Sequence, residues 1–148
     1  MSGSIVVSPA GVADLDLLTG LALRLWPAHD FDGLRAELDG VLRSGGAFFL
    51  ARRGRDAVGF AQCQLRRDYV EGTDTSPVGY LEGIFVDPAC RGQGVARRLL
   101  AACEDWSRSQ GCSEFASDCE LENGPSRLFH LHSGFCEAGR IICFVKKL

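Results

Sequence analysis

The stretch "YLEGIFVDPACRGQGVARRLL", residues 80–100, joins an apolar run to a helical pattern through a short loop. The apolar run ends at Asp87-Pro88, and Arg91-Gly92-Gln93-Gly94 comes directly before a helix that we expect to begin near Val95. The first turn of a helix presents unpaired N–H groups and the positive end of the helix dipole. Glycine lets the backbone approach a ligand or adopt a positive φ, and arginine adds a cation that matches phosphate geometry. We therefore predict that this loop binds a pyrophosphate.

Two other kinds of phosphate-binding loop are excluded by the sequence. It contains no G-x-x-x-x-G-K-[ST] motif, so the loop is not a P-loop, and it lacks the G-x-G-x-x-G spacing of a dinucleotide site.

Outside this stretch, the pattern of apolar residues and breakers predicts one mixed α/β domain over residues 1–148, without repeats or linkers. Helical spacing of leucines follows Asp14, and a turn-rich "RGRD" separates two apolar runs that read as a hairpin. The expected strands are 4–8, 47–52, 57–65, 80–86 and 113–118, with a final strand pair within 135–147; the expected helices are 14–26, 34–45, 95–110 and 126–132.

Composition narrows the classes of function. A net charge of −3 does not favour nucleic-acid binding, which needs a basic face. No apolar run approaches the roughly 18–20 residues of a membrane span, and the N-terminus lacks the features of a signal peptide, so we expect a cytoplasmic protein that does not bind membranes. The seven cysteines form no C-x-x-C pair or cluster with zinc-ligand spacing, so we expect reduced thiols packed as small apolar groups and no metal.

The central loop resembles the coenzyme A loop of the GCN5-related N-acetyltransferases, [RQ]-x-x-G-x-[GA]. The match is Arg91-Gly92-Gln93-Gly94-Val95-Ala96 after a strand ending in "FVDP", and "HSGF" at 132–135 corresponds to a later turn of that family. The resemblance implies a central, mostly antiparallel sheet flanked by helices, with acetyl-CoA as co-substrate. It also implies that the pantetheine arm pairs with the strand through Ile84, Phe85 and Val86, and that Asn123 contacts this arm.

Three further blocks are similar to the aminoglycoside 6′-N-acetyltransferases of the same superfamily: "LWPAHD" (25–30), "RRDYVEGTDTSPVGYLEGIFV" (66–86) and "ASDCELEN" (116–123). This resemblance implies acetylation of the 6′-amine of an antibiotic, and a homodimer. It places Trp26, His29 and Tyr69 in the antibiotic pocket. Taken alone, an aromatic residue and an imidazole such as Trp26 and His29 usually belong to the core.

Carboxylates are the side chains that the substrate of such an enzyme requires. Glu82 lies inside the apolar "YLEGIFV", where a buried, unpaired carboxylate would be costly, so we interpret it as a functional group and general base rather than as half of a structural ion pair. Asp118 would lie near Glu82 if their strands are neighbours, as the family fold implies, and would help to hold the substrate ammonium.

Two positions depart from the pattern of the resembling families. Many members have a tyrosine that protonates the leaving thiolate four residues before the glycine of the "GF" turn, and here that position is His130. An imidazole can do the same chemistry, or it can be a histidine on a helix surface. Some aminoglycoside-modifying relatives have an acidic residue before the arginine of the last strand, where this chain has Gly139.

Other functions remain open at this point. The same fold could acetylate a polyamine or a protein N-terminus. A coenzyme A-binding module without activity would not need Glu82 in an apolar strand, and a toxin that modifies aminoacyl-tRNA would need a basic surface.

Overall fold

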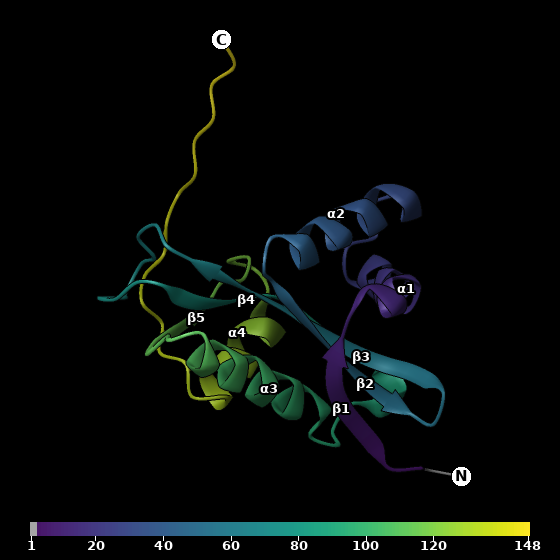
Figure 1. The fold of residues 1–148 in the computed structure, drawn as a ribbon. Helices are drawn as coiled ribbons and strands as arrows, with labels where there is room; N and C mark the ends of the chain where they lie inside the picture. The colour runs from purple at the N-terminus through teal and green to yellow at the C-terminus, as the bar shows by residue number, and fades with distance from the viewer. Residues whose placement is uncertain (1–2) are drawn as a thin grey trace.

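A five-stranded sheet forms the centre of the computed structural model, which describes residues 3–148 (Figure 1). Its strands, in spatial order, are β1 (Ile5–Ala10), β2 (Ala47–Arg53), β3 (Asp56–Arg66), β4 (Val78–Val86) and β5 (Phe115–Ser117). The first four are antiparallel, and β5 pairs with β4 in parallel. This arrangement confirms the mixed, mostly antiparallel sheet that the sequence predicted.

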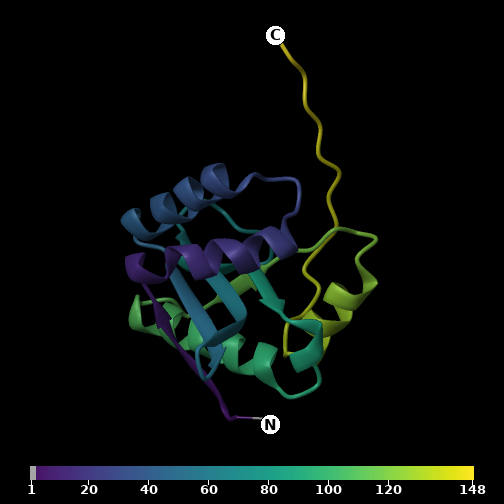
Figure 2. The same ribbon diagram turned by 90° about the vertical axis from the view of Figure 1, so that its right-hand side faces the viewer.

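Helices cover both faces of the sheet (Figures 1 and 2). They are α1 (Leu15–Leu25), α2 (Phe31–Arg43), α3 (Val95–Ser109) and α4 (Gly124–His132), with short 3₁₀ turns at Val12–Asp14 and Pro88–Cys90. Each face has its own core, and β2 shows why: Phe48 and Leu50 pack with α1 and α2, whereas Phe49 and Ala51 pack with α3. Side chains of a strand alternate between faces, so one apolar strand serves both cores.

The expected helices and most strands are confirmed with small shifts of their ends. Asp14 does occupy the N-cap position of α1, but its carboxylate accepts from the N–H of Gly11 and pairs with Arg52. The predicted strand over 113–118 is shorter, because only Phe115–Ser117 pairs with β4.

The expected strand pair within residues 135–147 is wrong for the single chain. Residues 135–148 have no regular secondary structure, and those from 140 onward, here called the C-terminal arm, extend away from the body of the molecule (Figure 1). The arm exposes large apolar side chains: Ile141, Ile142, Phe144 and Val145 are 77–93% exposed. A strand needs a neighbour for its backbone N–H and C=O groups, and residues 3–148 of one copy supply none at this place.

Four of the cysteines are core residues, as expected: Cys63, Cys90, Cys103 and Cys112. A hydrogen bond with Cys63, together with burial, raises the pKa of the Cys103 thiol. Cys119, Cys136 and Cys143 are exposed. Over residues 3–148 there is no group of three or more His, Cys, Asp or Glu side chains placed to hold a metal ion. Within the same range, no helix is both long and apolar enough to cross a bilayer.

Candidate active site

The loop before α3 has the backbone geometry that its glycines predicted. Gly92 and Gly94 have φ values of 76° and 77°, and Gly94 is the N-cap of α3, which begins at Val95. Apart from each glycine and its chain neighbours, no atom lies within 4 Å of where a Cβ of Gly92 or Gly94 would be, so the loop is open on that side. The Arg91 side chain turns back and donates from Nε to the carbonyl of Val86 at 3.0 Å. Binding of a pyrophosphate by this loop stays a prediction that the geometry suits.

One edge of β4 is paired only in part. Its parallel pairing with β5 covers Gly79, Tyr80 and Leu81, whereas Gly83–Val86 pair with β3 alone. Backbone N–H and C=O groups on the other side of Ile84 and Phe85 therefore have no strand partner within the described part of the chain. An extended ligand with amide groups can bind such an edge as an added strand.

A β-bulge lies where this edge becomes free. Gln62 pairs with Gly83 and Cys63 pairs with Leu81, so Glu82 is an extra residue between two consecutive pairs. The bulge changes the alternation of the strand: Leu81 and Ile84 are three residues apart, yet both pack in the core under α3. Bulges re-aim side chains and interrupt pairing, which are the two changes seen at Glu82.

The Glu82 carboxylate forms an ion pair that the sequence did not predict. Arg66 Nη2 lies 2.9 Å from Oε1 of Glu82, and Arg66 Nε lies 3.3 Å from Oε2. The guanidinium carbon is 3.4 Å from the centre of the Tyr80 ring, and the Tyr80 hydroxyl donates to Asp118. Glu82 and Asp118 therefore belong to one network, as expected, but Arg66 and Tyr80 connect them.

Tyr80 acts in this network as a hydrogen-bond donor only. Burial, then the hydrogen bond to Asp118, raises the pKa of the Tyr80 hydroxyl. The phenol thus keeps its proton at any physiological pH, and it fixes the orientation of the Asp118 carboxylate.

His130 lies beside the point where β4 and β5 separate. Its Nδ1 is 2.7 Å from the carbonyl oxygen of Ser126, and its Nε2 is 2.8 Å from the hydroxyl of Ser117. Because a carbonyl only accepts, Nδ1 carries a hydrogen in this arrangement. Ser117 Oγ is itself 3.2 Å from the carbonyl oxygen of Leu81, so His130 connects through one hydroxyl to the edge of β4.

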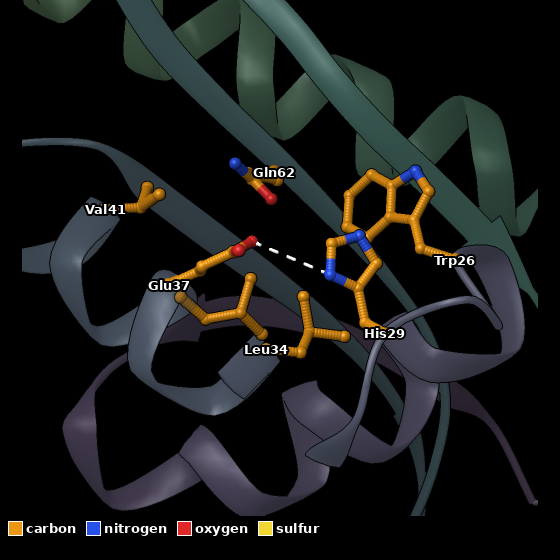
Figure 3. Close-up of a pocket in the computed structure, with 7 residues that line it drawn as sticks. Trp26, His29, Leu34, Glu37, Val41 and Gln62 are labelled. Carbon is orange, nitrogen blue, oxygen red and sulfur yellow. Dashed lines mark ion pairs between the residues drawn. The ribbon is translucent and has the colours of Figure 1, made fainter. Parts of the chain in front are cut away.

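The residues expected to bind the substrate fall into two groups. Trp26 and His29 line a cleft between α2 and β3 (Figure 3). Tyr69 is instead 76% exposed in the loop before β4, with its hydroxyl 3.4 Å from the Glu71 carboxylate. Gly139 lies beside the same loop, because a Cβ there would be 3.4 Å from Oε1 of Glu71. Asn123 caps α4: its side-chain oxygen accepts from the N–H of Ser126 at 3.2 Å.

Comparison with known proteins gives consistent results. Residues 15–135 match the model of the acetyltransferase (GNAT) family. The chain is 43% identical to aminoglycoside N(6′)-acetyltransferase type 1 of Salmonella typhimurium strain LT2, over 90% of this chain and 92% of that protein. It is 42% identical to the protein of the same name from Stenotrophomonas maltophilia, over 93% and 90% of the two chains.

Solved structures of similar proteins extend the comparison to bound ligands. Aminoglycoside N-acetyltransferase AAC(6′)-Iy in complex with CoA is 38% identical and superposes with a TM-score of 0.95, over 100% of this chain and 98% of that one. AAC(6′)-Iy in complex with the bisubstrate analogue CoA-S-monomethyl-acetylneamine is 39% identical with a TM-score of 0.94, over 99% and 100% of the two chains.

Proposed function

The chain belongs to the acetyltransferase (GNAT) family, and on that basis we propose that it transfers the acetyl group of acetyl-CoA to the 6′-amine of aminoglycoside antibiotics. The observation that carries this proposal is the arrangement on β4: the strand offers a free backbone edge at Ile84 and Phe85, and a carboxylate network begins at Glu82 beside it. Similar proteins bound to CoA and to a CoA–neamine analogue support both halves of the reaction. An acetylated amine loses its charge, so the antibiotic would lose a cationic contact with ribosomal RNA.

Acetyl-CoA would lie along β4 with its pyrophosphate at the start of α3. The cradle comprises the N–H groups of residues 92–96 and the side chains of Arg91 and Gln93. The pantetheine arm would pair with Ile84, Phe85 and Val86, near the N-cap of α4 at Asn123. No metal takes part in this scheme.

Glu82 is the proposed general base, acting directly or through a water molecule, and Asp118 helps to hold the substrate ammonium. The ammonium first gives a proton to Glu82, and the neutral amine then forms a bond to the thioester carbon, whose carbonyl is polarised by a backbone N–H of β4. As the C–S bond breaks, the nitrogen releases its second proton to solvent. The leaving thiolate takes a proton from Nε2 of His130 in its doubly protonated form, while the Nδ1–H stays bonded to the Ser126 carbonyl.

The antibiotic side of the site would include Trp26, His29 and Tyr69. Its reacting group is a primary amine on a methylene, as in kanamycin and tobramycin, because such an amine can reach between the two strands more easily than a ring-bound one. Most of the attraction is between partly exposed charges, so binding should weaken with added salt.

We also propose a homodimer, which acts in the cytoplasm where acetyl-CoA is available. The exposed apolar side chains of the C-terminal arm support association, since a second copy could cover them.

The test of the proposed function uses two aminoglycosides that differ only in a 6′-amino or a 6′-hydroxyl group. We expect release of coenzyme A with the first and none with the second, and NMR of the product should show the acetyl group on the 6′-nitrogen. Equal acetyl transfer to both antibiotics would contradict the assignment of the 6′-amine as the reacting group. Transfer to a polyamine or a peptide N-terminus, but to no aminoglycoside, would overturn the substrate class.

A further inference from the structure

Gln62 on β3 has a buried oxygen without a hydrogen-bond partner. The side chain is only 7% exposed, and its Nε2 donates to Oε1 of Gln64 at 3.1 Å. Its own Oε1 is buried and has no donor among residues 3–148. Figure 3 shows this oxygen turned toward the cleft between α2 and β3, in the direction of His29 and Glu37. Buried polar atoms are nearly always paired, so the missing donor needs an explanation.

The cleft contains two oxygen acceptors, the Glu37 carboxylate and Oε1 of Gln62, and no positively charged partner for them other than the His29 ring. It has a volume of about 180 Å³, lined by Trp26, His29, Leu34, Glu37, Leu38, Val41 and Gln62, with no lysine or arginine. The Glu37 carboxylate lies 4.0 Å from His29 Nδ1, which is beyond hydrogen-bond distance, and the Trp26 ring forms one wall. An ammonium group fits this combination, because it supplies several donors and is attracted by both a carboxylate and an indole face.

The cleft adjoins the place of the reacting amine. Gln62, Gln64 and Arg66 alternate along one face of β3, and the last of them holds Glu82. Gln62 is paired in register with Gly83, the residue after Glu82, and a Cβ on Gly83 would come within 2.6 Å of the Trp26 ring. One ligand can therefore reach both the Glu82 carboxylate and the cleft.

We propose that this cleft is a subsite for a second ammonium group of the substrate, held by Oε1 of Gln62 and the carboxylate of Glu37. The inference rests on the proposed function, because it assumes a substrate with several amines. The reacting amine would lie at Glu82 and Asp118, and a neighbouring ammonium would enter between α2 and β3. The subsite thus favours polyamino sugars over single amines.

The experiment compares two substrates, neamine with several ammonium groups and methyl 6-amino-6-deoxyglucopyranoside with one. The measured quantity is the ratio of their kcat/KM values. Gln62→Met keeps the length of the side chain and removes the acceptor, and it should lower the ratio about tenfold, since the bond is to a charged donor. Glu37→Gln should lower it about two- to threefold and reduce its dependence on salt, because Glu37 is largely exposed.

Asp32→Asn is the matched control, because it removes the same charge from the exposed side of the same helix, outside the cleft. It should leave the ratio as it is in the wild type. An unchanged ratio in Gln62→Met, with an unchanged melting temperature, would overturn the subsite.

Calorimetric Kd values for neamine separate this inference from the proposed function. If the wild type binds neamine without acetylating it, the proposed function fails, and the subsite is then judged by whether Gln62→Met weakens binding about tenfold. Equal Kd values for wild type and variant would contradict the subsite, and no binding to the wild type would overturn both proposals.

Discussion

At the scale of single residues, the bidentate contact between Arg66 and Glu82 defines the surroundings of the proposed general base. An amine that approaches Glu82 meets a carboxylate whose two oxygens already accept from a guanidinium. The guanidinium is in turn held over the Tyr80 ring. Arg66 therefore holds the Glu82 carboxylate in one orientation, and the Glu82 side chain keeps 20% of its surface exposed.

Replacing Glu82 tests whether this carboxylate takes part in the reaction. Glu82→Gln keeps the shape and removes the base, so we expect kcat/KM for a 6′-amino aminoglycoside to fall by roughly 10² to 10⁴. Glu104→Gln, the same change on α3, should have no effect on the rate. If kcat/KM of Glu82→Gln is less than threefold below that of the wild type at every pH from 6 to 9, and the variant melts normally, Glu82 is a purely structural residue.

The sequence singled out Glu82 and Asp118 but not Arg66 and Tyr80, which connect the two carboxylates in the structure. A carboxylate in an apolar strand is visible in the sequence, because burial without a purpose is costly. The role of Arg66 depends on the bulge at Glu82, which is a property of the paired strands, and on an ion pair across 16 positions of the chain. The available signal was the alternation of Gln62, Gln64 and Arg66 along β3, which marks a polar face.

At the scale of elements, the loop between β4 and α3 combines a positive-φ N-cap with an open approach to the helix. Gly94→Val would be strained at a φ of 77° and would place a branched side chain where the phosphates are proposed to bind. We expect the KM for acetyl-CoA to rise at least several-fold, as measured by initial rates at saturating aminoglycoside.

Gly111→Val is the matched control for that change. Gly111 follows the other end of α3, has a φ of 90° and also has open space around it, and the helix that separates it from Gly94 is about 22 Å long. It should lower the melting temperature comparably without changing the KM. If both variants raise the KM for acetyl-CoA alike, the rise comes from destabilisation of the protein and not from damage to the phosphate site.

Local chemistry explains why this element could be predicted. A proline, two glycines and an apolar helical face all lie within 21 consecutive residues, so the strand, loop and helix are each specified nearby in the chain. The final strand pair was wrong for the opposite reason: its apolar residues read as strand, but a strand also needs a neighbour that local sequence cannot reveal.

At the scale of the whole molecule, the C-terminal arm is the feature that one copy of the chain leaves incomplete. A double substitution, Ile142→Asp with Phe144→Asp, replaces two of its large exposed apolar side chains by charges, so we expect a dimer of the wild type to become a monomer in multi-angle light scattering. Lys146→Asp changes charge in the same arm without removing an apolar side chain, and it should remain dimeric. A monomeric wild type at tens of micromolar would contradict the dimer.

The two uses of β4 have a consequence for how new drug specificities arise. The strand would offer backbone atoms at its edge to the acyl donor and side chains on its face to the acceptor. Backbone groups are the same whatever the residue, so substitutions on the face can be selected under a new antibiotic while the donor site is preserved. Substitutions of a few side chains around Glu82 could thus change which antibiotics are accepted, while the backbone site for acetyl-CoA stays the same.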